Sequence, residues 1–372
     1  MNPTEQNAQT ADSIENAIQK ITDTPQTVAP NAMPPSKSGI PSAVVTHLSV
    51  CIVNWNTRDM LLDALASIYT SASSSDPGAS DSDSSETNSE TNSETNLEEL
   101  FVFEVIVVDN ASADGSAQAV AERYPQVILI ANQDNKGYAE GNNQAMERAN
   151  GAYILLLNPD VILPPDGLQR AVAFMEQHSE AGALGVRQVY PDGTVQRSVR
   201  GFPTPLAVLW ELLGISRLFA NSPFFGAYRM TYFDYVQVAE VDQPMGTFLL
   251  IRREVIHQVG LLDLAFPIFF NEVDWCLRCK RAGWKIYFTP DVEIIHYGGA
   301  STTQVGAAMA WESRRGLLRF YDKHYRSPWF WPFRATIALA SWPHAWLQAR
   351  RRGRTVTRGG HPYGGVISSL LL

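Results

Sequence analysis

Two carboxylates at the start of a helical pattern are the strongest candidates for chemistry in this sequence. Glu272 and Asp274 follow the aromatic approach of Phe269, Phe270 and Asn271. A carboxylate at the start of a helix and beside bulky apolar groups is partly desolvated, so its pKa can rise toward the range of a general base. The same position also suits a carboxylate that only complements the helix dipole. The residues alone leave both interpretations open.

Polar side chains follow each of four predicted strands. Apolar runs at residues 48–53, 101–108, 127–131 and 153–157 read as buried strands, and a helical pattern follows each of the first three and begins past Pro165 after the fourth. Such alternation predicts an α/β fold with a parallel, doubly wound sheet, in which ligands bind beyond the carboxyl ends of the strands. The polar residues at these ends are Asn54, Asn56, Asp109, Asn110, Asn132, Asn135, Asn158 and Asp160. Four polar strand ends on one edge predict a binding site there.

Phosphate binding at this edge would need a metal ion. Neither a GxGxxG motif nor a P-loop follows the first strand, which disfavours both kinds of phosphate site. Asp160, fixed by Pro159, is a natural carboxylate ligand for Mg²⁺ or Mn²⁺ bridging a diphosphate. His296 is the second candidate ligand, since imidazole suits Mn²⁺ better than Mg²⁺. The alternatives are a simple turn at Asp160 and a buried, hydrogen-bonded structural histidine at His296.

Five segments in order resemble glycosyltransferase family two, and more narrowly its rhamnosyltransferase-like branch. They are residues 48–69, 105–116, 135–143, 156–160 and 271–301, and the resemblance covers residues 48–325 apart from one acidic insertion. It implies the GT-A fold, a doubly wound, mostly parallel sheet with a Rossmann-like nucleotide-binding half (48–160) and an acceptor half (161–325).

The resemblance also implies roles for the polar strand ends. Asp109 would recognise the nucleotide base, and Asp160 and His296 would contact the metal or the diphosphate. Asn158 replaces the first carboxylate of the family's Asp-x-Asp motif. The donor-binding residues that it implies are Asn54, Asn56, Asp109, Asn110, Asn135, Gly137, Asn142 and Asn158.

The base position departs from the family pattern. Relatives usually carry Glu-Asp, one residue and then Asp, whereas this chain has Asn271 and Glu272 before Val273 and Asp274. Glu272 therefore falls on the catalytic position and Asp274 on the supporting one. We expect Glu272 to be the base, with Asp274 as the alternative.

The implied reaction is an inverting transfer of a deoxyhexose such as rhamnose from a nucleoside-diphosphate sugar to a lipid-linked or polysaccharide acceptor. It would belong to cell-envelope glycan synthesis. One alternative is a protein glycosyltransferase. Another is a catalytically inactive GT-A module that binds glycans or acts as a scaffold, because Asn158 and Asn271 replace family carboxylates.

Charge divides the chain into regions. The formal net charge is −9, and eight acidic residues without any Lys or Arg lie between residues 71 and 99. This low-complexity stretch and residues 1–47 are predicted to be disordered. From residue 310 onward eleven Lys and Arg stand against two acidic residues, which favours anionic lipid or phosphate partners. Nucleic acid is not an expected partner.

The predicted C-terminal tail, residues 326–372, combines tryptophan with arginine. Its apolar run at 335–346 is short and interrupted by Pro343 and His344, which disfavours a membrane-spanning helix. A tryptophan-rich face beside arginines indicates docking on anionic lipid, and a helix packed on the domain is the alternative. With three cysteines and no signal peptide, the sequence predicts a cytoplasmic protein, peripheral on the inner face of the plasma membrane.

Three further predictions concern the middle of the chain. Residues 185–190 and 195–199 are expected to form a hairpin, and residues 202–241 an irregular acceptor wall or lid. Cys276 and Cys279 form a CxxC inside a helical pattern, for which packing is favoured over a redox or zinc role.

Overall fold

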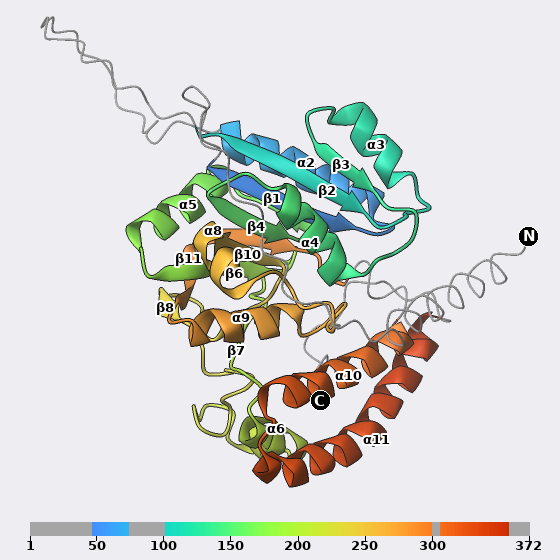
Figure 1. Ribbon diagram of the computed structural model, residues 1–372, viewed down its shortest axis with the longest axis vertical. Coiled ribbons are helices and arrows are strands. Elements are labelled where there is room, and N and C mark those ends of the chain that lie inside the picture. Colours follow the sequence, from blue (N-terminus) through green and yellow to red (C-terminus); the bar gives the residue numbers. More distant parts are fainter. Residues whose placement is uncertain (1–46, 74–100, 300–305, 357–372) are drawn as a thin grey trace, which may run out of the picture.

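The computed structural model describes residues 47–73, 101–299 and 306–356. Of the predicted disordered segments, 1–47 and 71–99, the structure describes only residue 47 and residues 71–73. The prediction is wrong for residues 71–73, which are the end of a helix, with Ser71 buried against Leu168. The predicted tail is described only as far as residue 356. A central sheet carries helices on both faces, and two long C-terminal helices lie at one end of the molecule (Figure 1).

The first half of the sheet is parallel, as predicted. Its strands run in the order β3-β2-β1-β4 and all pair in parallel. They are β1 (Leu48–Asn54), β2 (Phe103–Asp109), β3 (Ile128–Ala131) and β4 (Tyr153–Leu157). The helices between them are α2 (Arg58–Ser73), α3 (Ser116–Arg123) and α4 (Tyr138–Arg148). Because β1 and β4 are buried along their whole length, they read as continuous apolar runs.

The second half makes the sheet mixed. Beyond β4 the order is β10-β6-β11-β5, with β8 on β11. β10 runs antiparallel to both β4 and β6, whereas the long pairing of β11 with β6 is parallel. The strands are β5 (Val161–Ile162), β6 (Ala181–Val189), β8 (Ala239–Glu240), β10 (Phe248–Arg252) and β11 (Lys285–His296). The helices of this half are α5 (Gly167–Gln177), α8 (Arg253–Val259) and α9 (Asn271–Arg281).

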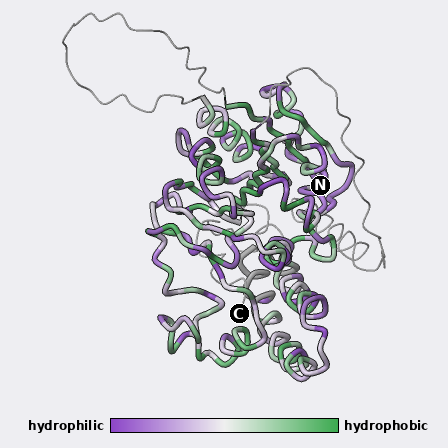
Figure 2. The backbone as a smooth tube through the Cα atoms, turned by 60° about the vertical axis from the view of Figure 1, so that its left-hand side comes forward, coloured by the Kyte–Doolittle hydropathy of each residue, from purple (hydrophilic) through white to green (hydrophobic). Residues whose placement is uncertain are grey.

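Three apolar clusters hold the layers together. One lies between the sheet and α2 and α5, and a second lies on the opposite face under α4, α8 and α9. Hydrophobic stretches accordingly gather in the middle of the molecule (Figure 2). A third cluster joins the start of α9, through Phe270 and Val273, to the C-terminal helices, through Phe320 and Ile337. Burial of these side chains fixes where α9 begins relative to the sheet.

The predicted hairpin is present but short. The strand begins four residues earlier than expected, at Ala181. Its partner pairs with it through the bridge between Val189 and Val195 and through backbone hydrogen bonds from Tyr190 to Thr194 and from Gln196 to Gln188. The following β7 (Val199–Arg200) instead pairs with β9 (Gln243–Pro244) in a separate two-stranded sheet. The hairpin pairing ends at Gln196, whose buried side chain hydrogen-bonds His296.

The segment predicted to be irregular contains two short helices, α6 (Pro205–Leu212) and α7 (Ile215–Leu218). Thr204 caps α6, because its Oγ1 accepts a hydrogen bond from the backbone nitrogen of Ala207, and Pro205 occupies the first turn. Most of the remaining residues of this segment are turns and bends. The prediction was therefore right about the loops and missed both helices.

Two C-terminal helices lie against each other: α10 (Gly306–His324) and α11 (Trp331–Val356), joined by the 3₁₀ turn η2 (Pro328–Phe330). The second of these helices continues through Pro343. Proline leaves the carbonyl of residue i−4 without a donor, here Leu339, which is exposed and can be hydrated. Among the described residues, no helix is both long and apolar enough to span a bilayer.

Candidate active site

The ends of β1 and β2 meet through their polar side chains. Asn54 and Asp109 are register partners, and the Asn54 Nδ2 donates to Asp109 Oδ2 at 2.9 Å. The other oxygen, Asp109 Oδ1, accepts the backbone N–H of Ser112 at 2.9 Å. Thr57 Oγ1 donates to Asn54 Oδ1 at 2.6 Å, so the Asn54 amide is held from both sides. The adjacency predicted from parallel strands is present, and it fixes the direction of the Asp109 carboxylate.

Asn56 ties together the two loops that follow these strands. Its Oδ1 accepts the backbone N–H of Ala113 at 2.8 Å, and its own N–H donates to Ser112 Oγ at 2.9 Å. The residue has a φ of 51°, in the left-handed region that asparagine tolerates better than most residues. In this structure Asn56 shapes the rim of the predicted nucleoside pocket.

A chain of amides holds the loop before α4. Asn110 Nδ2 donates to the carbonyl of Gly137 at 3.0 Å, and Asn135 Oδ1 accepts the backbone N–H of Gly137 at 2.9 Å. Gly137 has a φ of 86°, and a Cβ there would lie 3.2 Å from the carbonyl oxygen of Pro267. Asn142 donates to the carbonyl of Tyr138, and its Oδ1 is buried without a partner among the described residues. These residues therefore lie together at the strand ends, as predicted.

Asp160 and His296 face each other in a buried position. The pairing of β5 with β11 brings the two residues together, and His296 Nε2 lies 3.4 Å from Asp160 Oδ1. Gln196 donates to the carbonyl of His296 and places its Oε1 2.8 Å from His296 Nδ1. Since an amide oxygen only accepts, Nδ1 carries the proton. In the Nδ1–H tautomer, Nε2 turns a lone pair toward the Asp160 side.

The residues fit a metal ion of the predicted type. His296 Nε2 is buried and has no hydrogen-bond partner in the described part of the chain, so its lone pair is available to a metal ion. One carboxylate and one imidazole suit Mn²⁺ or Mg²⁺ only if other oxygens complete the shell. No cluster of three or more His, Cys, Asp or Glu occurs among residues 47–73, 101–299 and 306–356, so those oxygens would come from diphosphate and water.

Glu272 is connected to these strand ends through Tyr138. A Cβ on Gly246 would lie 3.6 Å from both Cβ and Cγ of Glu272 and 3.7 Å from the Tyr138 hydroxyl. That hydroxyl donates to the carbonyl of Gly246 at 3.0 Å and lies 3.3 Å from Asn158 Oδ1. Burial, with smaller contributions from the charges of Glu272 and Asp160, raises the pKa of Tyr138. Tyr138 therefore contacts both the strand end at Asn158 and the Gly246 backbone, beside which Glu272 lies.

Burial raises the pKa of Glu272 from 4.5 to about 7. Its only compensation is a backbone hydrogen bond, so desolvation dominates. A carboxylate with this pKa is well matched to accept a proton near neutral pH. Phe270, the residue before α9, has a φ of 70°, and the close approach of Gly316 from α10 lets its ring pack there.

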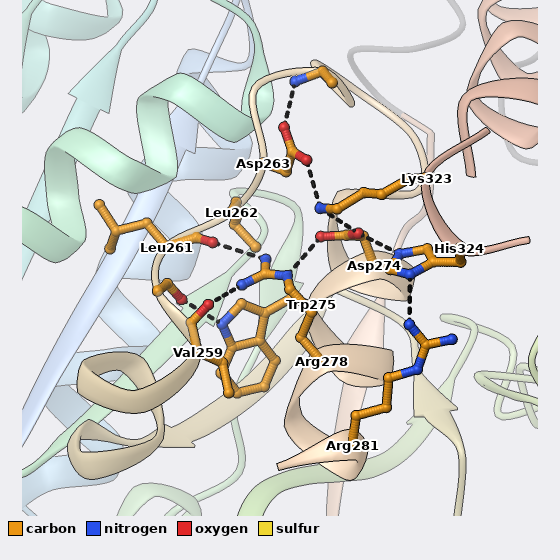
Figure 3. Close-up of polar contacts among 12 residues, drawn as sticks. Val259, Leu261, Leu262, Asp263, Asp274, Trp275, Arg278, Arg281, Lys323 and His324 are labelled. Atoms are coloured by element: carbon orange, nitrogen blue, oxygen red, sulfur yellow. Dashed lines mark hydrogen bonds and ion pairs between the residues drawn. The ribbon is translucent and has the colours of Figure 1, made fainter. Parts of the chain in front are cut away.

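Asp274 is engaged in a different way (Figure 3). It is fully buried and lies 2.8 Å from Arg278 Nε, 2.7 Å from Lys323 Nζ and 2.7 Å from His324 Nε2. Arg281 donates to His324 Nδ1, so His324 must donate to Asp274 through Nε2. Burial alone would raise the pKa of Asp274, but the bond from His324 and the charges of Arg278 and Lys323 lower it to about 2. Asp274 thus ties α9 to α10.

Cys276 and Cys279 lie in the second apolar cluster. Burial raises the pKa of Cys279 to about 12 and that of Cys276 well above its ordinary value. Both thiols are buried among apolar side chains, as expected for packing residues. The CxxC is therefore part of the packing of α9 under the sheet.

The chain that carries this site matches the model of a known protein family. A family model described as glycosyl transferase family 2 matches residues 49–260, more than half of the chain. The chain belongs to glycosyl transferase family 2. The matched range contains all four strand ends, Tyr138 and Asp160, and it stops before α9.

Two relatives of this glycosyltransferase are rhamnosyltransferases. The N-acetylglucosaminyl-diphospho-decaprenol L-rhamnosyltransferase of Mycobacterium tuberculosis strain H37Rv is 29% identical over 278 residues, covering 69% of this chain and 89% of its own length. The rhamnosyltransferase WbbL of Escherichia coli K12 is 27% identical over 206 residues, covering 52% of this chain and 73% of its own length. The mannosyltransferase PcManGT from Pyrobaculum calidifontis, solved with GDP-Man and Mn²⁺, gives a TM-score of 0.48 at 18% identity, covering 95% of this chain and 86% of that one.

Sequence reasoning gave no role to four residues of this glycosyltransferase that contact its candidate groups. Gln196 lies a hundred positions from the histidine that it orients, and Lys323 and His324 lie about fifty from Asp274. No local sequence pattern predicts contacts between residues so far apart in the chain. Tyr138 is different, because it stands inside a segment that the resemblance had already singled out.

Proposed function

We propose that this glycosyltransferase transfers a deoxyhexose such as rhamnose, with inversion, from a nucleoside-diphosphate sugar to a hydroxyl of a lipid-linked or polysaccharide acceptor. The observation that carries the proposal is the position of Glu272. A desolvated carboxyl with a pKa of about 7 lies against Gly246 and is linked through Tyr138 to the strand end at Asn158. An inactive scaffold has no need to keep a costly, partly buried carboxylate there.

The chemistry that these residues support is a single displacement. Glu272 takes the proton of the acceptor hydroxyl as its oxygen forms a bond to the anomeric carbon. The bond between that carbon and the diphosphate oxygen breaks, and the nucleoside diphosphate leaves with the electron pair. Asp274 does not compete for the proton, because three donors occupy it and its pKa is about 2. We therefore assign Asp274 to positioning α9.

The donor would lie along the strand ends. Asp109, with its direction fixed by Asn54 and Ser112, is suited to accept hydrogen bonds from the base. Asp160 and His296 would hold Mg²⁺ or Mn²⁺, which when bound supplies positive charge to the departing diphosphate. In this proposal residues 48–160 form the nucleotide-sugar half and residues 161–325 the acceptor half.

The acceptor class comes from the relatives. The name of the mycobacterial relative specifies a sugar on a diphospho-decaprenol lipid. We propose an acceptor of this kind for this protein. Such an acceptor places the reaction at the cytoplasmic surface of a membrane. Residues 202–241, with their short helices α6 and α7, would border the acceptor.

The test is release of nucleoside diphosphate from a panel of nucleotide sugars, with and without acceptor and with Mg²⁺, Mn²⁺ or chelator. The proposal expects release that depends on one deoxyhexose donor, rises with acceptor and falls on chelation. Binding of nucleotide sugar without release under every condition would favour the scaffold alternative. Transfer to a protein acceptor and not to a glycan or lipid-linked sugar would contradict the proposed acceptor class.

A further inference from the structure

One face of α11 is aromatic and open to solvent. Trp331, Leu339, Trp342 and Trp346 are 69%, 77%, 53% and 40% exposed. At 3.6 residues per turn these positions fall within an arc of about 80° on the helix surface. Trp329, on the turn before the helix, extends the same apolar stretch and is exposed as well. We call Trp329, Trp331, Leu339, Trp342 and Trp346 the α11 face.

The opposite side of α11 is already covered. Ile337, Ser341 and Ala345 recur at intervals of four and are buried, and Ile337 belongs to the cluster that includes α10 and α6. The core of this chain is therefore contacted by other residues of α11, and the α11 face is not its core-facing side. Solvation of several large apolar side chains on one helix is costly, so a contiguous patch of this kind marks a docking surface.

The charge of α11 identifies what docks. The helix has five arginines, at positions 334, 350, 351, 352 and 354, and no acidic residue. Arg334 is paired with Asp322, whereas Arg350 lies over the ring of Trp346 at 4.5 Å. Tryptophan beside arginine is the composition of a helix that lies in the interface of an anionic bilayer, with rings at headgroup depth and guanidinium groups on phosphates.

We propose that the α11 face is the docking surface of this protein for anionic lipid. The helix lies along the bilayer plane and does not cross it. Because α10 packs on α11 and is bound to α9 through Lys323 and His324, docking also fixes the distance of the Glu272 helix from the lipid surface. This last consequence rests on the proposed function, whereas the docking itself rests on α11 alone.

The experiment is cosedimentation of the full chain with vesicles of phosphatidylcholine, with or without phosphatidylglycerol, at low and high salt. We expect binding to the phosphatidylglycerol vesicles that weakens as salt screens the arginines. The double variant Trp331→Ser/Leu339→Ser should bind these vesicles at least about tenfold more weakly. It lacks two apolar side chains that are buried in the bilayer interface when the protein binds. The fluorescence of the remaining tryptophans should shift to the blue on binding by the unaltered protein.

The matched control is Val236→Ser/Val238→Ser. It also removes two exposed apolar side chains, from the segment before β8 at the far side of the sheet, and it should bind vesicles like the unaltered protein. Equal loss in both double variants, or no loss in the α11 variant, overturns the proposal. So does light scattering that shows a dimer which only the α11 variant converts to monomer, because the occupant would then be a second copy of the chain.

Failure of the docking and failure of the proposed function are separable. Nucleoside-diphosphate release with a water-soluble acceptor should be unchanged in the α11 variant, because none of its substitutions lies among the candidate catalytic or donor-binding residues. If vesicle binding follows the pattern above while no donor is turned over, docking stands and the proposed function fails. If turnover is normal and vesicle binding is absent, the proposed function stands and the docking proposal fails.

Discussion

Two carboxyl groups two residues apart on one helix have opposite electrostatic environments. Burial without a cation raises the pKa of Glu272 to about 7, whereas His324, Arg278 and Lys323 outweigh burial and lower the pKa of Asp274 to about 2. The difference follows from helical geometry. Side chains at i and i+2 point in different directions, so only Asp274 reaches α10.

Glu272→Gln should lower turnover by roughly 10² to 10⁴ and leave the fold intact, because the amide keeps the shape and loses the basic oxygen. Nucleoside-diphosphate release measures the first effect and thermal unfolding the second. The removal of a partly buried, desolvated carboxyl should leave stability at neutral pH unchanged or slightly higher. Near-native turnover in this variant would show that Glu272 is not the base.

The pH profile should follow the same group. Glu272 must be deprotonated to accept a proton, so kcat/KM should rise as pH increases through about 7. For stability the sign is opposite. The folded pKa exceeds the unfolded value of 4.5, so the contribution of Glu272 is fully present below 4.5 and is lost as pH rises through about 7. A kcat/KM that is flat from about pH 6 to pH 8 would contradict the assignment.

Gln196 should control metal binding through His296. Replacement by leucine removes the acceptor that holds the proton on Nδ1, so the Nε2 lone pair is no longer selected. We expect about 10- to 100-fold weaker Mn²⁺ binding in the presence of nucleoside diphosphate, measured by electron paramagnetic resonance without turnover. His296→Ala serves as the reference for complete loss. Unaltered Mn²⁺ affinity in both variants would remove these residues from the metal site.

At the scale of elements, the start of α9 is fixed from two directions. Phe270 and Val273 pack on α10 in an apolar cluster. Asp274 binds Lys323 and His324 at the C-terminal end of α10. The same helix buries Trp275 and both of its cysteines under the sheet. α9 is therefore held between the sheet and α10, which keeps Glu272 beside Gly246.

Asp274→Asn should lower the free energy of unfolding by roughly 3 kcal/mol, because Arg278 and Lys323 would lose a buried partner. The matched control is Asp59→Asn, which breaks an exposed pair with Arg58 and should cost less than about 1 kcal/mol. Because the folded pKa of Asp274 is depressed, its stabilisation is present above pH 3.8 and is lost as pH falls through about 2. Denaturant unfolding compares both variants, and equal costs would exclude a clamping role.

At the scale of the whole molecule, α2 and β2 pack in the same apolar cluster. The insertion separates α2 from β2, and its composition offers little apolar area to bury. Most of the acidic excess of the chain comes from this stretch, whereas α11 is basic. The charge of the protein is therefore strongly segregated.

Deletion of residues 77–97 should change the free energy of unfolding by less than about 1 kcal/mol, since a shorter loop costs slightly less to close. Turnover should also be retained, because none of the candidate site residues lies there. Thermal unfolding and nucleoside-diphosphate release check both points. A loss of several kcal/mol would show that the insertion packs on the fold.

The sequence by itself determined the parallel half of the sheet and the residues at its edge. Apolar runs such as residues 48–53 and 153–157 are local signals, and parallel pairing necessarily brings Asn54, Asp109 and Asp160 to one side. Family membership followed from the same segments. These features depend on neighbours in the chain, which a sequence displays directly.

The tertiary structure decided the rest. The antiparallel insertion of β10, the short length of the hairpin and the continuation of α11 through Pro343 all depend on what packs beside each segment. So do the proton on His296 Nδ1 and the low pKa of Asp274, because their partners are distant in sequence. Burial and pairing of charge arise only when the chain is folded, and they determine which carboxylate on α9 is suited to accept a proton.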